Sequence, residues 1–184
     1  GKEGALFLGL TDDLHWLKNQ ERLTFARVGI TDPLDINDYE KHAGFNGLRK
    51  AIELEPQLIV NEVTDSGLRG RGGAAFPTGI KWQTVLNTPS KTKYIVCNAD
   101  EGDSGTFSDR MIMENDPFVL IEGMIIAGMA VGAEYGYIYL RSEYPDAQEV
   151  LNKAINIAKE KGFLGNNILS SGYNFDLEVT RAAG

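Results

Sequence analysis

The run Tyr94-Ile95-Val96-Cys97-Asn98-Ala99-Asp100-Glu101 decides the fold. Its first four residues are apolar and favour β structure, as expected of a strand that is buried on both faces of a parallel sheet. Its last four residues are mostly polar, which is typical of the point where a buried strand ends. The run therefore predicts a strand over residues 94–97 that delivers polar groups to one edge of a sheet.

The chain after this run alternates between helix and strand patterns. Helices are predicted over Pro117–Gly132, which is mostly apolar, and over Pro145–Lys161, which is amphipathic. Strands are predicted over Tyr137–Leu140 and Phe175–Val179, and the first of these ends in the polar run 141–143. This order implies right-handed crossovers, so we predict an α/β fold with a parallel sheet and flanking helices. Ligands of such sheets bind outside the carboxyl ends of the strands.

The region before the first strand is predicted to be irregular and then helical. Residues 1–36 are polar with little periodicity. Asn37 is predicted to cap a helix that runs to about Leu54, and a second helix is expected over Gln57–Asp65. The sequence is thus divided into an irregular lead-in, 1–36, and an α/β domain, 37–184.

Composition and charge exclude several classes of function. The net charge of −8 argues against nucleic-acid binding, which requires clustered Lys and Arg. The single cysteine, Cys97, excludes an internal disulfide and fits a reducing compartment. No apolar stretch reaches the roughly 18 residues of a membrane span. We therefore expect a cytoplasmic protein without direct membrane insertion, and Gly1 in place of Met suggests a fragment or a processed chain.

The segment Ser66–Trp82 is rich in glycine and is the first candidate for a ligand site. Four of the seven residues 67–73 are glycines, which leave backbone N–H groups free to form an anion-binding nest. Arg71 and Lys81 add positive charge, and Phe76 and Trp82 add flat apolar faces. Phosphate, sugar and a flat ring together describe a nucleotide or a flavin.

Two common phosphate-binding motifs do not account for this segment. Gly70-x-Gly72-x-x-Ala75 matches the dinucleotide fingerprint in letters, but that motif must follow a strand, and here a helix precedes it. The P-loop needs glycine directly before lysine, whereas Ile80 separates Gly79 from Lys81. A glycine-rich linker is the remaining alternative, although linkers rarely carry so many aromatic and basic residues.

The segment 97–106 is acidic and allows three interpretations. Asp103 or Ser104 could cap a helix that begins near Thr106. Oxygen ligands could bind a hard cation, but the spacing does not match an EF-hand, and we expect no metal site. Alternatively, the carboxylates and Asn98 bind ligand hydroxyls. In that case the ligand phosphate lies near the basic residues of segment 66–82, because carboxylates repel it.

The two segments together resemble a known family. Residues 70–82 followed by Cys97-Asn98-Ala99-Asp100-Glu101 resemble the 51-kDa flavoprotein subunit of respiratory complex I, a module also found in NAD-reducing hydrogenases and NAD-dependent formate dehydrogenases. The resemblance continues through Ile121–Met124, Gly136–Tyr139 and Arg141-x-Glu143-Tyr144. Residues 102–107, which read Gly-Asp-Ser-Gly-Thr-Phe, and the upstream segment Leu23–Arg27 are most similar to the corresponding segments of the formate dehydrogenase β subunit.

The resemblance implies a Rossmann-like domain that transfers hydride between NAD(H) and FMN and passes electrons to iron–sulfur clusters. It implies that Glu101 acts catalytically by tuning the flavin potential through its charge, that Phe76 stacks on the dinucleotide, and that Asp103 lies near the nicotinamide. The implied FMN-binding residues are Gly70, Arg71, Gly72, Gly73, Lys81, Asn98, Asp100 and Glu101. The implied partners are NAD(H) and the other subunits of a multi-subunit iron–sulfur oxidoreductase.

The sequence departs from the family pattern at two positions. Ala75 replaces a glycine, and Asp103 stands where many complex I members have glutamate. The family places a 4Fe–4S cluster in a later domain, and Cys97 alone cannot hold one. Because the domain is expected to be incomplete at its C-terminal end, the fragment alone is expected to bind FMN weakly and to be inactive. A non-catalytic scaffold with the same fold is the alternative.

Overall fold

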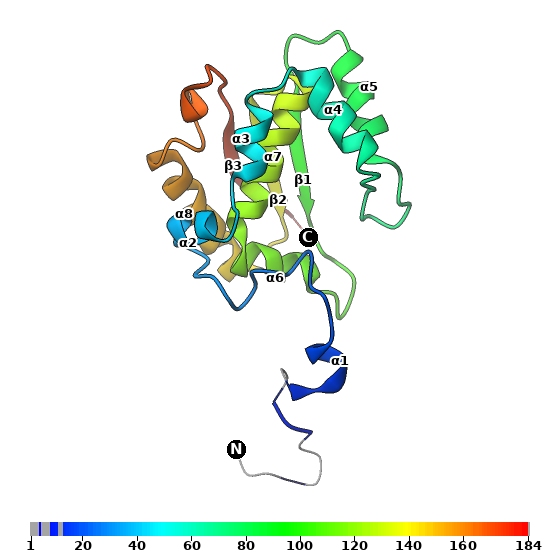
Figure 1. Ribbon diagram of the computed structural model, residues 1–184, viewed down its shortest axis with the longest axis vertical. Helices are drawn as coiled ribbons and strands as arrows, with labels where there is room; N and C mark the ends of the chain where they lie inside the picture. The colour runs from blue at the N-terminus through cyan, green and yellow to red at the C-terminus, as the bar shows by residue number, and fades with distance from the viewer. Residues whose placement is uncertain (1–3, 5–7, 11–12, 184) are drawn as a thin grey trace.

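The computed structural model describes residues 4, 8–10 and 13–183 (Figure 1). Its three strands form one sheet, and its helices precede and connect them. The elements in chain order are α1 (His15–Lys18), α2 (Ile36–Lys41), α3 (Asn46–Ala51), α4 (Pro56–Asp65), α5 (Thr78–Asn87), β1 (Tyr94–Ala99), α6 (Ser108–Asn115), α7 (Pro117–Val131), β2 (Tyr135–Leu140), α8 (Pro145–Glu160), a short 3-10 turn (Ile168–Ser170) and β3 (Asp176–Arg181).

The sheet has the strand order β1-β2-β3, and both neighbouring pairs are parallel. Helices α6 and α7 connect β1 to β2, and α8 connects β2 to β3. The α/β class with flanking helices that the sequence predicts is therefore confirmed. Because the strands are parallel, their carboxyl ends lie along one edge of the sheet.

The helices cover one face of the sheet. Helix α7 contacts β1 and β2, and α8 contacts β3. Eleven of the 15 residues of α7 are buried, because α3, α4 and α5 pack on it as well. Apart from the exposed Arg181 at the end of β3, the side chains of the covered face are small or aliphatic, and they are Ile95, Cys97, Ala99, Gly136, Ile138, Leu140, Leu177 and Val179.

The opposite face of the sheet is open, so the expectation that the first strand is buried on both faces is wrong. Tyr94 is 53 % exposed and Val96 is 64 % exposed. Both crossovers run in the same direction along the sheet. A right-handed connection therefore places α7 and α8 on the same side, and no described helix covers the other.

The helix expected from Asn37 to about Leu54 is two helices, α2 and α3, with a sharp break between them. The cap of α2 is Asp35, whose carboxylate accepts hydrogen bonds from the N–H groups of Asn37 and Asp38 at 2.9 and 3.3 Å. Asn37 is therefore not the capping residue. At the break, Ala43 and Phe45 have left-handed backbone conformations, with φ of 66° and 58°.

The buried carboxylate of Glu122 holds this break in place. It accepts hydrogen bonds from the Tyr39 hydroxyl at 2.5 Å and from the N–H groups of Phe45 and Leu48 at 2.9 Å each. Gly44 is required beside it, because a Cβ there would collide with the Tyr39 ring. Glu122 lies on α7, so one carboxylate attaches the α2–α3 region to the central helix.

Helix α5 begins inside the glycine-rich segment 66–82, where the sequence indicates a loop. Helix α6 follows the acidic segment, where a helix near Thr106 was one of the three interpretations. The helices α4 and α5 approach closely at Gly79, where a Cβ would lie 2.8 Å from the Thr64 Cα. Among the described residues, no helix is both long enough and apolar enough to span a bilayer.

The role of Glu122 predicts a large loss of stability in a Glu122→Ala variant. Three buried donors would lose their acceptor, which should lower the free energy of unfolding by about 3 kcal/mol or more. Urea denaturation measures this, with Glu160→Ala on the exposed end of α8 as the matched control, expected to change stability by less than ~0.5 kcal/mol. A loss below ~1 kcal/mol in Glu122→Ala would contradict the assignment.

Candidate functional site

The carboxyl edge of the sheet collects the polar groups that follow β1 and β2. Asn98 is exposed near the end of β1, and its side-chain oxygen accepts a hydrogen bond from the Asp100 N–H at 3.0 Å. The Arg141 N–H donates to the Ala99 carbonyl at 3.2 Å. This bond holds the segment that follows β2 beside the segment that follows β1; we call these segments the β2 exit and the β1 exit. Asp100 is exposed, so its carboxylate is accessible to a ligand.

Glu101 is a buried carboxylate at this edge, with 7 % of its surface exposed. Its Oε1 accepts from the Asp109 N–H at 3.0 Å and from the Ser108 hydroxyl at 3.2 Å. Its Oε2 accepts from the Arg110 N–H at 3.1 Å and from the Tyr144 hydroxyl at 3.2 Å. Burial raises the pKa of Glu101, but the bonds from the two backbone N–H groups, Tyr144 and Ser108 outweigh it and leave the pKa lowered.

These contacts make Glu101 the cap of helix α6. The sequence correctly allowed for a capped turn in this segment, but the expected capping residues, Asp103 and Ser104, do not cap α6. The carboxylate lies at the positive end of the helix dipole, where a negative charge is stabilised. Since four donors already occupy its oxygens, its charge acts on the surroundings more readily than its lone pairs bind a ligand.

Arg141 and Tyr144, which follow β2, hold Glu101 in place, and the sequence did not single them out for this role. The Arg141 guanidinium donates to the Glu101 carbonyl and lies over the Tyr144 ring, with 5.1 Å between its Cζ and the ring centre. Arg110 also lies over this ring, at 5.3 Å. The polar run 141–143 after the second strand indicated that these residues lie near the site, but a sequence pattern does not show which groups Arg141 contacts.

The glycine-rich segment folds into a closed loop between α4 and α5. The Gly70 N–H donates to the Phe76 carbonyl at 2.8 Å, and the Thr78 N–H donates to the Leu68 carbonyl at 2.9 Å. The Arg69 side chain braces the loop by donating to the Ala75 carbonyl at 2.9 Å. Arg69 is thus a structural residue of the loop, unlike the two other cations nearby.

The tip of this loop presents unused hydrogen-bond donors. Within the described part of the chain, the backbone N–H groups of residues 71–76 donate to no protein acceptor. Helix α5 starts directly after the loop without a side-chain cap, so the positive end of its dipole faces the same region. Free N–H groups at a helix N-terminus form an anion-binding site.

Two cations adjoin these donors. The Lys81 ammonium lies against the loop backbone at Gly70, where a Cβ would stand 2.5 Å from its Nζ and would displace it. Arg71 and Lys81 are exposed, and neither forms an ion pair with an acidic side chain of the described residues. No Cβ contact restricts the space at Gly72 and Gly73.

The loop also holds one strained residue. Ala75 has a left-handed backbone with φ of 49°, a region that glycine adopts without cost. Phe76, next to it, is 50 % exposed, so part of its side chain is accessible to a ligand. Asp103 is exposed as well, at the turn before α6.

The structure therefore brings the predicted site residues together as two groups. Gly70 and Arg71 lie on the loop before α5 and Lys81 lies in the first turn of α5, whereas Asn98 and Asp100 lie at the carboxyl end of β1. No hydrogen bond or ion pair joins the two groups among the described residues. Figure 1 shows both the α4–α5 loop and the chain after β1 on the side of the molecule toward which β1 points.

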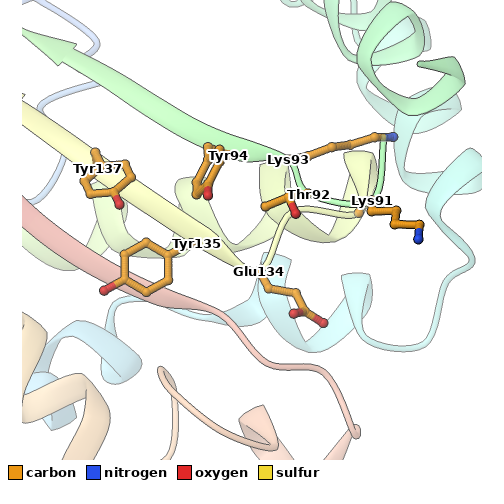
Figure 2. Close-up of a pocket in the computed structure, with 8 residues that line it drawn as sticks. Lys91, Thr92, Lys93, Tyr94, Glu134, Tyr135 and Tyr137 are labelled. Atoms are coloured by element: carbon orange, nitrogen blue, oxygen red, sulfur yellow. The ribbon is translucent and has the colours of Figure 1, made fainter. Parts of the chain in front are cut away.

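A depression of about 490 Å³ lies at the other end of the strands (Figure 2). It is lined by side chains from the start of β1 and β2 and from the turns before them, namely Lys91, Thr92, Lys93, Tyr94, Gly132, Glu134, Tyr135 and Tyr137. This depression is at the amino edge of the sheet, so it is separate from the candidate site. No group of three or more possible metal-ligating side chains was found in the described part of the chain.

Comparison with protein families gives one match over most of the domain. The model of the Nuo51 FMN-binding domain matches residues 63–184. This range includes the glycine-rich loop, the β1 exit and the entire sheet.

Curated relatives agree with this match. The HndC subunit of the NADP-reducing hydrogenase of Solidesulfovibrio fructosivorans is 48 % identical over 167 residues, which are 91 % of this chain and 34 % of that protein. The F subunit of the NADH-quinone oxidoreductase of Aquifex aeolicus is 50 % identical over 149 residues, 81 % of this chain and 35 % of that protein. Its counterpart in Escherichia coli is 46 % identical over 164 residues, 88 % of this chain and 37 % of that protein. The chain thus spans about a third of the length of these relatives.

Solved structures give the same result for the fold. The crystal structure of an NAD+-reducing NiFe-hydrogenase in the H2-reduced state superposes with a TM-score of 0.67 and 30 % identity, over 90 % of this chain and 26 % of that chain. The air-oxidised state gives a TM-score of 0.65 and 31 % identity. The chain therefore belongs to the Nuo51 FMN-binding domain family, which confirms the resemblance to the 51-kDa flavoprotein subunits.

Proposed function

We propose that this chain holds FMN at the carboxyl edge of its sheet and positions it for hydride transfer with NAD(H). One observation carries the proposal: the backbone N–H groups of residues 71–76 donate to no acceptor among the described residues. They lie beside two exposed cations and the start of α5. When bound, FMN exchanges a hydride with the nicotinamide and passes the two electrons on singly. The family match over residues 63–184 supports FMN as the ligand.

The glycine-rich loop fits the phosphate end of FMN. A phosphate dianion needs several donors and positive charge, and the loop offers both without rearrangement of its backbone bonds. In the proposal, Gly70, Gly72 and Gly73 contact the phosphate and the ribityl chain through their backbone, while Arg71 and Lys81 neutralise the phosphate charge. An Arg guanidinium and an ammonium bind phosphate oxygens with charge-assisted hydrogen bonds.

The β1 exit fits the ribityl and ring end of FMN. Asn98 and Asp100 are exposed and offer an amide and a carboxylate to hydroxyl and ring N–H groups. Glu101 is proposed to act by its charge on the flavin, since its oxygens bind the α6 terminus, Ser108 and Tyr144. The carboxylates also favour an orientation in which the phosphate points away from them and toward the cations of the loop.

The NAD(H) site is proposed to lie beside the flavin. The exposed ring of Phe76 offers a face on which a base or a nicotinamide stacks. Asp103 is proposed to accept a hydrogen bond from the nicotinamide carboxamide. Hydride transfer between stacked rings needs orientation and close contact, so no general acid or base is assigned to this chain.

This chain spans about a third of the length of its relatives, so the activity of those whole proteins enters here only as a proposal. We propose that electrons leave through iron–sulfur clusters, including a 4Fe–4S cluster of the longer polypeptide, to other subunits. Formate is the proposed electron donor, because the version of residues 102–107 with Leu23–Arg27 is most similar to formate dehydrogenase β subunits.

The purified complex is accordingly expected to reduce NAD+ with formate. The assay is the absorbance of NADH under anaerobic conditions, with hydrogen as the comparison donor because one relative is a hydrogenase subunit. Reduction by hydrogen without reduction by formate would contradict the formate assignment while leaving the flavin site intact.

The phosphate assignment predicts weaker flavin binding when either cation is removed. Arg71→Ala and Lys81→Ala in the full-length protein should each raise the dissociation constant of FMN by about tenfold or more, since each loses a charge-assisted contact. Flavin fluorescence titration of the apoprotein measures the constant. Lys91→Ala is the matched control, because Lys91 is exposed at the amino edge of the sheet, away from the site.

Unchanged FMN affinity in both variants would overturn the assignment of Arg71 and Lys81. A parent protein that binds no FMN and shows no NADH oxidation with ferricyanide would instead support the non-catalytic scaffold. The two failures are distinguishable, because only the second concerns the parent protein.

A further inference from the structure

The tip of the glycine-rich loop, residues 71–76, is held by few contacts. Among the described residues, no backbone hydrogen bond joins two residues of the tip. Two hydrogen bonds reach the tip from outside, and both end on carbonyls near its C-terminal end. The Gly70 N–H donates to the Phe76 carbonyl at 2.8 Å, and the Arg69 Nη1 donates to the Ala75 carbonyl at 2.9 Å. The conformation of the tip therefore depends strongly on these two bonds.

Ala75 needs such a contact, because its backbone lies in the left-handed region with φ of 49°. A free alanine strongly prefers negative φ, whereas glycine adopts either sign with little cost. Strained backbone of this kind persists only where the surrounding structure enforces it. Within the described chain, Arg69 is the only side chain that forms a hydrogen bond with the tip, and its charge strengthens that bond. Arg69 is therefore the side chain that opposes the relaxation of Ala75.

The same bond orients one donor of the proposed phosphate site. A trans peptide is planar, so the carbonyl of Ala75 and the N–H of Phe76 point in opposite directions. Because the carbonyl binds the Arg69 guanidinium, the Phe76 N–H points away from it, and this N–H donates to no described acceptor. The other free N–H groups, of residues 71–75, directly precede it in the chain. Arg69 therefore fixes one end of the row of free donors.

We propose that Arg69 is a positioning residue of the FMN phosphate site. It holds the peptide between Ala75 and Phe76, so that the N–H groups of the tip are arranged before the phosphate binds. A preorganised site loses less conformational entropy on binding and therefore has a higher affinity. In this role Arg69 touches the loop and not the ligand, unlike Arg71 and Lys81. The inference rests on the proposed function, since it takes the FMN phosphate as the ligand of the loop.

The first test compares FMN with riboflavin, which lacks the phosphate, in fluorescence titrations of the full-length apoprotein. Arg69→Met removes the donor and keeps an unbranched stem. It should raise the Kd of FMN by about tenfold, the scale of one lost hydrogen bond to a charged group, and change the Kd of riboflavin by less than about twofold. Equal rises for the two flavins would indicate general damage to the domain and would overturn the proposal.

The second test separates a brace from a direct contact with the phosphate. Ala75→Gly allows the positive φ without a brace, so in that background Arg69→Met should raise the Kd of FMN by less than about threefold. A direct contact between Arg69 and the phosphate would instead give the same tenfold loss in both backgrounds. Arg71→Ala is the matched control. Because Arg71 is proposed to contact the phosphate itself, its loss should agree within about twofold in the two backgrounds.

A failure of the site and a failure of the Arg69 role give different results. A parent protein with equal Kd values for FMN and riboflavin would overturn the phosphate site and the role of Arg69 with it. A parent that prefers FMN, with an Arg69→Met variant that keeps this preference, would overturn only the role of Arg69.

The fold of the variant provides a further check. Since Arg69 is exposed, Arg69→Met should fold with a melting temperature within about 2 °C of the parent. Failure to fold would also overturn the proposal, because the assigned role is confined to the loop.

Discussion

The buried carboxylate of Glu101 fixes the chain where β1 ends, and the geometry of the candidate site depends on it. Two N–H groups of α6 and two hydroxyls bind its oxygens, and the Arg141 side chain binds its carbonyl. The exits of β1 and β2 and the start of α6 therefore behave as one unit. Asn98 and Asp100 are presented to solvent from a segment that is held at both ends, which reduces the entropy lost when a ligand orders them.

Charge is divided between the two halves of the site. Exposed cations and available N–H groups lie on the α4–α5 loop, whereas the carboxylates lie on the β1 exit. A ligand with one anionic end and one polyol or ring end has a single favourable orientation between them. Gly70 contributes to this division of charge, because it has no side chain and the Lys81 ammonium lies in the space that a Cβ would occupy.

Local sequence patterns predicted the parallel sheet, the two crossover helices and the two segments of the site. They did not predict features that depend on distant residues. The left-handed turn at Phe45 is stabilised by Glu122, which lies on a different helix 77 residues later. Likewise, Asp103 and Ser104 were reasonable caps for α6 by spacing, but Glu101 takes that place because Arg141 and Tyr144 hold it there. The open face of the sheet was not predicted, because an apolar run in the sequence does not indicate whether one face of a strand or both faces are covered.

The most direct measurement of the central claim is the amide shift of selectively labelled glycine in the full-length protein, recorded with FMN and with riboflavin. The two ligands differ only by the phosphate. If the free N–H groups of the α4–α5 loop bind that phosphate, the signals of Gly72 and Gly73 will move downfield with FMN and stay in place with riboflavin. Identical spectra with the two ligands, or glycine signals that move with neither, would contradict the account.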